Sequence, residues 1–259
     1  MKTKMIFKNK FGYYLKGLGY TYILTFLFIF LLPIVFALLF TGSLDGISIH
    51  NLLKNNLLPF ISILFLVISS YRVYGPFKFY IQNGISRRTV WKATIWVTAL
   101  LSLLMSVINY CYYYAVILPN VGNVDNTFYN QLFGQFLGFH SFWNIPAQIL
   151  YEWLLLWSFA VLGMFFGSLS ALLKKRTRRM LWIAIPIGLV VLVRFLMQFH
   201  TGMNLDWTMN FIKFVVGYTE TTNEGEWNPF HPVGFMAIMI ILGTIINYWI
   251  QQHIVLKNQ

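Results

Sequence analysis

Two ionisable side chains lie inside long apolar stretches of the sequence, where a charged group is costly and is usually retained for a function. Glu152 lies within residues 145–173, and Arg194 lies within residues 180–199. At a rise of about 1.5 Å per residue, each side chain lies roughly 10 Å from the same end of the two neighbouring stretches. We therefore predict an ion pair that joins these segments or lines a cavity open to that side.

Other catalytic groupings are not supported by the pattern. Ser168 and Ser170 lie near one end of their apolar stretch, and of the five histidines only His253 is predicted at that end, with no acid near it. A membrane metalloprotease is equally disfavoured, because Glu152 is the only acid in an apolar stretch and no His-x-x-x-His occurs. We expect no catalytic residues, no metal site and no enzyme activity in this chain.

The composition determines the class of protein. Hydrophobic residues make up 58% of the 259 positions and charged residues only 10%, which a soluble chain of this size could not bury. We predict an all-α membrane protein with a single transmembrane domain, 1–259, since each crossing needs about 20 apolar residues. Its six predicted spans are 20–40, 53–73, 89–118, 145–173, 180–199 and 232–252. Pro33, Pro59 and Pro186 lie in or near these spans and are expected to kink them.

The positive charges determine the predicted orientation. Most Lys and Arg residues lie before the first span, between the second and third spans, and between the fourth and fifth spans. Only Lys54, at the start of the second span, and Lys213 lie in or beside the first, third and fifth connections. The positive-inside rule therefore places the N- and C-termini in the cytoplasm. The net charge of +12 then suits anionic membrane lipid or an acidic cytosolic partner, and it does not indicate nucleic acid.

Residues 1–19 carry an apolar stripe. Its members recur at three- and four-residue spacing between lysines: Phe7, Phe11, Tyr14, Leu15 and Leu18. This pattern predicts an N-terminal interfacial helix on the inner face of the membrane. A frayed basic tail that serves only the orientation rule is the alternative.

The connection between the second and third spans contains a sequence of helix signals. Gly75-Pro76 favours a helix start, Asn83-Gly84 a helix stop, and Ser86 the cap of a new helix. We predict a short helix, a sharp bend and a second helix that continues into the third span. The residues expected to face the cytoplasm at this bend are Gln82, Asn83, Arg87 and Arg88. The alternative is an ordered loop that serves only topology.

Small and polar residues suggest how the spans pack. Gly163 and Gly167 form a G-x-x-x-G motif that permits close approach of two helices. Asn109 and Gln198 are expected to form hydrogen bonds between helices. The connection 200–231 is long enough to have its own structure, and residues 207–216 are predicted to form a short outer helix.

The chain resembles the permease subunits of type-2 ATP-binding-cassette exporters over nearly its full length. In the segment QNGISRRTVWK, the family's Gly-hydrophobic-Ser-Arg-Arg pattern is matched by Gly84, Ile85, Ser86, Arg87 and Arg88. The segment WNPFHP, 227–232, resembles the Asn-Pro step that often precedes the last span of that family. Topology carries as much of the resemblance as these short motifs.

The resemblance implies a function that the residues alone do not. The bend, formed by Gln82, Asn83, Gly84, Ile85, Ser86, Arg87 and Arg88, would be a coupling helix that docks on a cytosolic ATPase subunit. A second permease, identical or different, would complete the translocation pathway, and residues 200–231 would form an outer re-entrant gate. The sequence has no G-x-x-x-x-G-K-[ST] motif, so ATP-Mg is expected only on the partner ATPase, with no cofactor in this chain.

The resemblance thus predicts export of a hydrophobic or amphipathic compound, such as a peptide or drug, across a bacterial plasma membrane. A stand-alone secondary transporter is the main alternative, although it would normally have more spans or an internal repeat with broken helices. An intramembrane protease is the weaker alternative, for the reasons given above. The identity of the compound and its physiological purpose are not encoded in any motif of the sequence.

Overall fold

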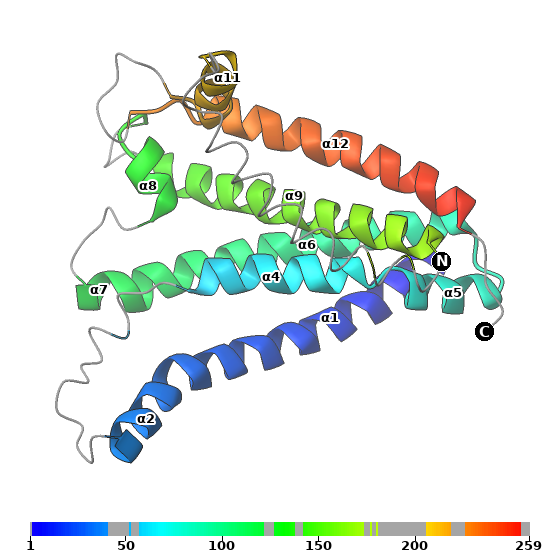
Figure 1. Ribbon diagram of the computed structural model, residues 1–259, viewed down its shortest axis with the longest axis horizontal. Coiled ribbons are helices and arrows are strands. Elements are labelled where there is room, and N and C mark those ends of the chain that lie inside the picture. The colour runs from blue at the N-terminus through cyan, green and yellow to red at the C-terminus, as the bar shows by residue number, and fades with distance from the viewer. Residues whose placement is uncertain are drawn as a thin grey trace.

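The structure is a computed structural model that describes residues 2–40, 52, 57–121, 127–137, 142–173, 177, 180, 206–218 and 226–254. Within these ranges every regular element is helical (Figure 1). Five helices are long and apolar enough to cross a membrane, and they coincide with five of the six predicted spans. The other predicted span, 180–199, lies outside the described residues except for Met180, and so does Arg194.

The first helix is continuous from the N-terminal segment into the first span. α1 (Lys2–Phe26) passes through a π-helical turn, η1 (Leu27–Leu31), into α2 (Leu32–Phe40), and its direction changes there (Figure 1). Pro33 accounts for this turn, because proline lacks an N–H donor and its ring clashes with the preceding turn of a regular helix. The kink predicted at Pro33 is therefore confirmed. Pro59 lies in the first turn of α4 (Leu58–Tyr71), where a proline is tolerated without a kink.

A separate interfacial helix over residues 1–19 is not found, because no break divides these residues from the first span. The stripe predicted to face lipid packs instead against the bundle. Tyr14 and Leu18 are buried, and Phe7 and Phe11 contact the same hydrophobic cluster, which is contributed by α4, α6 (Arg87–Tyr112) and α9 (Asn144–Leu172). Leu15 is the exception, since 42% of its side chain is exposed.

α9 is the central helix and contacts α4, α6 and α12 (Phe230–His253). Its two motif glycines face α4. A Cβ atom added to Gly163 would lie 2.7 Å from the carbonyl oxygen of Val67, and one added to Gly167 would come even closer to that of Tyr71. Any larger residue would push the helices apart, so the close approach predicted from G-x-x-x-G is confirmed.

Both ends of the described chain lie at one end of the bundle. Ile6 near the N-terminus and Ile254 near the C-terminus are fully buried in one cluster with Phe77 of α5 (Tyr74–Gln82). We call this the bend end, and we call the opposite end the far end. α9 finishes at the bend end, whereas α11 (Asp206–Val216) lies at the far end (Figure 1). A sixth crossing between them is consistent with this placement and stays a prediction.

Short elements cover the far end. α11 matches the helix predicted over residues 207–216 and contacts α12 near its start, and α8 (Phe128–Phe133) contacts α9 (Figure 1). The N–H of Trp227 donates to the carbonyl of Leu132 at 3.0 Å, and the N–H of Asn228 donates to that of Gly217 at 3.0 Å. The Asn228 side chain then accepts the N–H of Phe230 at 3.0 Å, so the Asn-Pro step begins the last helix.

Candidate functional site

The bend that follows α5 is a well-formed helix stop. Gly84 has a φ of 71°, in the left-handed region that glycine adopts without a steric penalty. Its N–H donates to the carbonyl of Ile81 at 3.0 Å, and the N–H of Ile85 donates to that of Tyr80 at 3.1 Å. These two bonds form a Schellman motif, completed by the apolar contact of Ile85 with Tyr80. The stop predicted from Asn-Gly is confirmed.

Ser86 caps the helix that follows. Its backbone is extended, with φ −65° and ψ 145°, and its Oγ accepts the N–H of Thr89 at 3.3 Å. This bond satisfies one of the free N–H groups in the first turn of α6. The short helix, the bend and the second helix that the sequence predicts are therefore all present.

The bend has an exposed side and a buried side. The residues of the predicted coupling segment that are exposed are Gln82, Asn83, Gly84, Ser86 and Arg88. Ile85 is only 7% exposed and packs inward. Phe79 is 62% exposed on the adjoining turn of α5. The exposed side thus combines an aromatic ring, amides and one cation.

Arg87 does not face outward with Arg88, contrary to the prediction. Its guanidinium donates to the backbone carbonyls of Gln251 and Gln252 in the last turn of α12, and it lies 5.9 Å from the centre of the Phe77 ring. The carbonyls at a helix C-terminus lack intrahelical donors and carry partial negative charge, which explains why a cation is drawn there. Arg87 therefore fastens the bend to the last helix.

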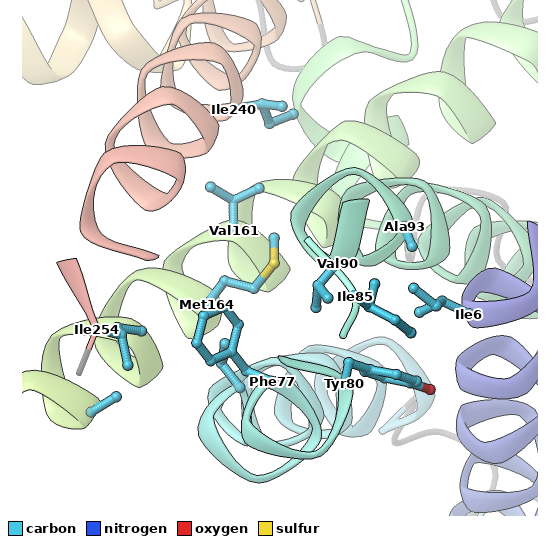
Figure 2. Packing of buried hydrophobic residues seen from close by; sticks show 12 residues of the cluster. Ile6, Phe77, Tyr80, Ile85, Val90, Ala93, Val161, Met164, Ile240 and Ile254 are labelled. Atoms are coloured by element: carbon cyan, nitrogen blue, oxygen red, sulfur yellow. The ribbon is translucent and has the colours of Figure 1, made fainter. Parts of the chain in front are cut away.

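A hydrophobic cluster beneath the bend joins five helices. Figure 2 shows side chains from α1, α5, α6, α9 and α12 converging on one another. Its labelled members are Ile6, Phe77, Tyr80, Ile85, Val90, Ala93, Val161, Met164, Ile240 and Ile254. We call this set the bend cluster. Because well-packed side chains transmit displacement, a shift of α5 would be felt by the other four helices.

A lysine is buried beside the bend cluster. Lys10 of α1 is 7% exposed, and its ammonium donates to Thr94 Oγ1 of α6 at 2.6 Å. The same ammonium lies 5.8 Å from the centre of the Tyr80 ring of α5. A hydroxyl and an aromatic face partly replace the water that a lysine loses on burial. Lys10 thus connects the first helix to both helices that flank the bend.

Trp91 adds a further connection to α12. Its Nε1 donates to the carbonyl of Thr244 at 3.3 Å, and its ring centre lies 4.9 Å from that of Tyr248. Together with Arg87, this side chain holds the first turns of α6 against the second half of α12. The bend is consequently part of a rigid junction.

A second polar site lies within the spans. The carboxyl group of Glu152 on α9 accepts the Asn109 side-chain amide of α6 at 2.7 Å. The predicted partner of Glu152, Arg194, lies outside the described residues, so the ion pair stays a prediction. Among the described residues, the partner of Glu152 is an amide and not a cation.

Asn109 is the centre of this intramembrane network. It is 3% exposed and exchanges hydrogen bonds with Ser62 of α4 at 3.2–3.3 Å. Tyr22 of α1 shares a hydrogen bond with the Ser62 hydroxyl at 2.9 Å and donates to Asn109 Oδ1 at 3.4 Å. Four helices therefore meet at one amide, which confirms the predicted role of Asn109 as a hydrogen bond former between helices. Gln198, predicted to act similarly, lies outside the described residues.

Neither Ser168 nor Ser170 forms a catalytic pair with His253. The hydroxyl of Ser168 is buried without a hydrogen bond to any described residue, and that of Ser170 donates to the carbonyl of Gly167 in its own helix. His253 is exposed, and its Nδ1 is bonded to the carbonyl of Trp249. Neither serine is therefore activated by a base in this arrangement.

No protein-family model, curated protein or solved structure matched the chain in comparisons with known proteins. Any function assigned to it therefore depends on the geometry of the bend and of the intramembrane network. Two features of that geometry were not predicted from sequence, namely the inward turn of Arg87 and the burial of Lys10. Each depends on a partner more than 80 residues away along the chain.

Proposed function

We propose that this chain is the permease subunit of an exporter driven by a separate ATPase, which docks on the exposed side of the bend. The observation that carries the proposal is the combination of an exposed surface at the bend with a buried side connected to five helices. A loop needed only for orientation requires positive charge but none of these connections. A loop that receives force from a partner requires both an exposed surface for docking and a buried side connected to the spans.

The geometry suggests how movement of a partner would reach the membrane. A displacement applied at Gln82, Asn83 or Arg88 would move α5 as a unit, because the Schellman bonds fix its end. The bend cluster would pass that shift to α1, α9 and α12, and Arg87 would pass it to the last turn of α12. Hydrolysis of ATP-Mg would occur on the partner, which supplies the phosphate-binding loop that this chain lacks.

The remaining parts of the proposal concern the pathway. A second permease would complete it, and the cargo would be a hydrophobic or amphipathic compound, in keeping with the apolar and aromatic composition of the spans. The elements α8 and α11 lie at the far end and are the candidates for an outer gate. The cytoplasm would lie at the bend end, where the described spans have most of their positive charge.

Site-directed cross-linking tests the docking step. Cys111 is the only cysteine, so Cys111→Ser gives a cysteine-free background into which Gln82→Cys is introduced. Membranes of the native host are then treated with a photoactivatable thiol reagent, and adducts are identified by mass spectrometry. We expect an adduct with a chain that contains a phosphate-binding loop, and its yield should change when ATP is added.

Lys8→Cys in the same background is the matched control, since Lys8 is also an exposed residue of the bend end but lies on α1. It should give little of that adduct. Equal adducts from Lys8→Cys and Gln82→Cys, or no ATPase among the adducts of Gln82→Cys, would refute docking at the bend and would favour a stand-alone transporter.

A further inference from the structure

An apolar groove separates α1 from α4. The two helices diverge from the bend end towards the far end (Figure 1), and the space between them is a groove of about 800 Å³. Apolar side chains from α1, η1 and α4 line its length, including Leu24, Phe28, Ile61 and Leu64. Such a volume falls within the usual range for sites that bind small molecules.

The serine and threonine hydroxyls in the groove wall are used by their own helices, and the Tyr14 hydroxyl donates across the groove to the carbonyl of Ser69 at 3.5 Å. Thr21 donates to the carbonyl of Gly17 at 2.9 Å, Thr25 to that of Thr21 at 2.8 Å, and Ser69 to that of Leu66 at 3.2 Å. Apart from the exposed side chains of Tyr13 and Tyr20, the wall therefore offers few free donors to a polar ligand along its length. It suits a hydrocarbon chain, which needs none.

Two cations lie in the groove lining at the bend end. Lys16 of α1 and Arg72, which follows α4, are both exposed lining residues, and none of the described lining residues is Asp or Glu. Neither side chain forms an ion pair with any other described residue. The groove is thus apolar along its wall and positive at one end, which is complementary to an anionic amphiphile.

The length of the groove matches one leaflet of a membrane. The distance from Lys16 of α1 to Phe28 in the following η1 turn is roughly 18 Å at about 1.5 Å per residue. Half of a hydrocarbon core is about 15 Å thick. A lipid whose headgroup meets Lys16 and Arg72 would therefore extend its acyl chains along the groove to near the middle of the bilayer.

The charge distribution favours a lipid over a second copy of the chain. The seven acidic residues are Asp45, Asp125, Glu152, Asp206, Glu220, Glu224 and Glu226, and none lies in the segments that precede α1 or join α4 to α6. A second copy therefore has no carboxylate at its own bend end to pair with these cations. The inner leaflet of a cell membrane, in contrast, is rich in anionic headgroups.

We propose that the groove between α1 and α4 binds one anionic phospholipid of the leaflet at the bend end. Lys16 and Arg72 hold the phosphate, and the apolar wall holds the acyl chains. This lipid fills the widening space that would otherwise leave α1 in contact with the bundle mainly at the bend end. The proposal does not depend on the transport function, because it concerns a lipid bound to the resting chain.

Native mass spectrometry of the full-length chain tests this site. The chain is reconstituted in nanodiscs of phosphatidylcholine with one-tenth phosphatidylglycerol, released into mild detergent, and the retained lipids are counted. We expect one phosphatidylglycerol per chain. Lys16→Glu with Arg72→Glu should lower its retention at least about tenfold, since each cation near a membrane surface contributes appreciably to anionic lipid binding.

Lys8→Glu with Lys92→Glu is the matched control, because it reverses two exposed charges outside the groove. It should retain the lipid. Thr21→Trp, which fills the groove and keeps both cations, should lose it. Should the doubly reversed variant not fold, Lys16→Gln with Arg72→Gln replaces it, and the elution volume on size exclusion reports folding.

Three results would overturn the proposal. One is equal lipid retention by the groove variant and its control. Another is equal retention of phosphatidylcholine and phosphatidylglycerol by the unaltered chain. The third is a change from dimer to monomer in the groove variant, measured by sedimentation, which would show that a second copy covers the groove.

Discussion

Removing the Asn109 side chain should destabilise the bundle more than any other single loss of a polar group in its interior. The amide donates to Glu152 at 2.7 Å and exchanges bonds with Ser62 at 3.2–3.3 Å. Polar contacts between membrane helices contribute about 0.6 kcal/mol each and at most about 1.7 kcal/mol. Leaving a buried carboxyl without its donor adds about 1–3 kcal/mol. We therefore expect Asn109→Leu to lower the free energy of unfolding by about 2–3 kcal/mol.

The measurement is unfolding of the purified chain in mixed micelles with increasing dodecyl sulfate, followed by the emission of its tryptophans. A double-mutant cycle with Glu152→Leu isolates the pair. We expect a coupling energy of about 1.5 kcal/mol, because the carboxyl no longer needs a donor once it is removed.

Asn247→Leu is the control for placing leucine at a buried asparagine. Asn247 is 1% exposed, but among the described residues its amide reaches only the backbone carbonyls of Val161 and Gly243, and its Oδ1 has no partner there. Its loss should cost less than about 1 kcal/mol. A cost for Asn109→Leu no larger than the control, or a coupling energy near zero, would refute the reasoning about the network.

Three further predictions concern the bend and the glycines. Gly84→Ala should lower the free energy of unfolding by about 1–2 kcal/mol. The cost comes from the positive φ alone, since nothing lies within 4 Å of the added Cβ. Gly75→Ala, which is equally open but has an ordinary φ, should leave the free energy of unfolding unchanged in the same micelle assay. Gly167→Ala should cost more than about 2 kcal/mol, because its Cβ would overlap α4, whereas Gly234→Ala, with open space around it, should not. Arg87→Gln should speed hydrogen exchange at the end of α12 about tenfold, as a helix-terminal cation is worth about 1–2 kcal/mol when partly buried, and Arg88→Gln should leave that exchange unchanged.

The bend could be predicted from sequence because its causes are local. A glycine that relieves a positive φ and a serine that accepts a nearby N–H act within four residues of one another. The helix in residues 207–216 was predicted for the same reason. The glycine contact of α9 joins distant segments, but G-x-x-x-G at one helix face predicts a close approach without naming the partner. In each case the residue type has one dominant structural use at that position.

The direction of Arg87 could not be predicted in this way. The positive-inside rule reports the side of the membrane on which a cation lies, and it says nothing about which neighbour the cation contacts. The partners of Arg87 are backbone carbonyls in α12, more than 160 residues later. Every residue type has a backbone carbonyl, so the sequence does not identify which one a cation contacts. The adjacent Arg88 has the same chemistry and is exposed.

The apolar stripe of the N-terminal helix illustrates a different limit. A stripe at helical spacing with lysines beside it suits a membrane interface and a packed helix surface equally well. Its position against α6 is decided by contacts such as those of Tyr14 and Leu18, which no local pattern contains. Lys10 gave the pattern an interfacial appearance, yet its ammonium is buried against Thr94.

The burial of Lys10 also determines when the first helix can take its place during synthesis. Its hydroxyl partner, Thr94, is made 84 residues later, which corresponds to roughly 4–17 s at about 5–20 residues per second. The hydrogen bonds of the Tyr22 hydroxyl likewise cannot form until Ser62 and Asn109 have been synthesised. Until α6 emerges, the Lys10 ammonium must keep water or an anionic headgroup as its neighbour. The bundle therefore closes around α1 only after its third long helix is made, and the N-terminal helix is the first to be synthesised but not the first to dock.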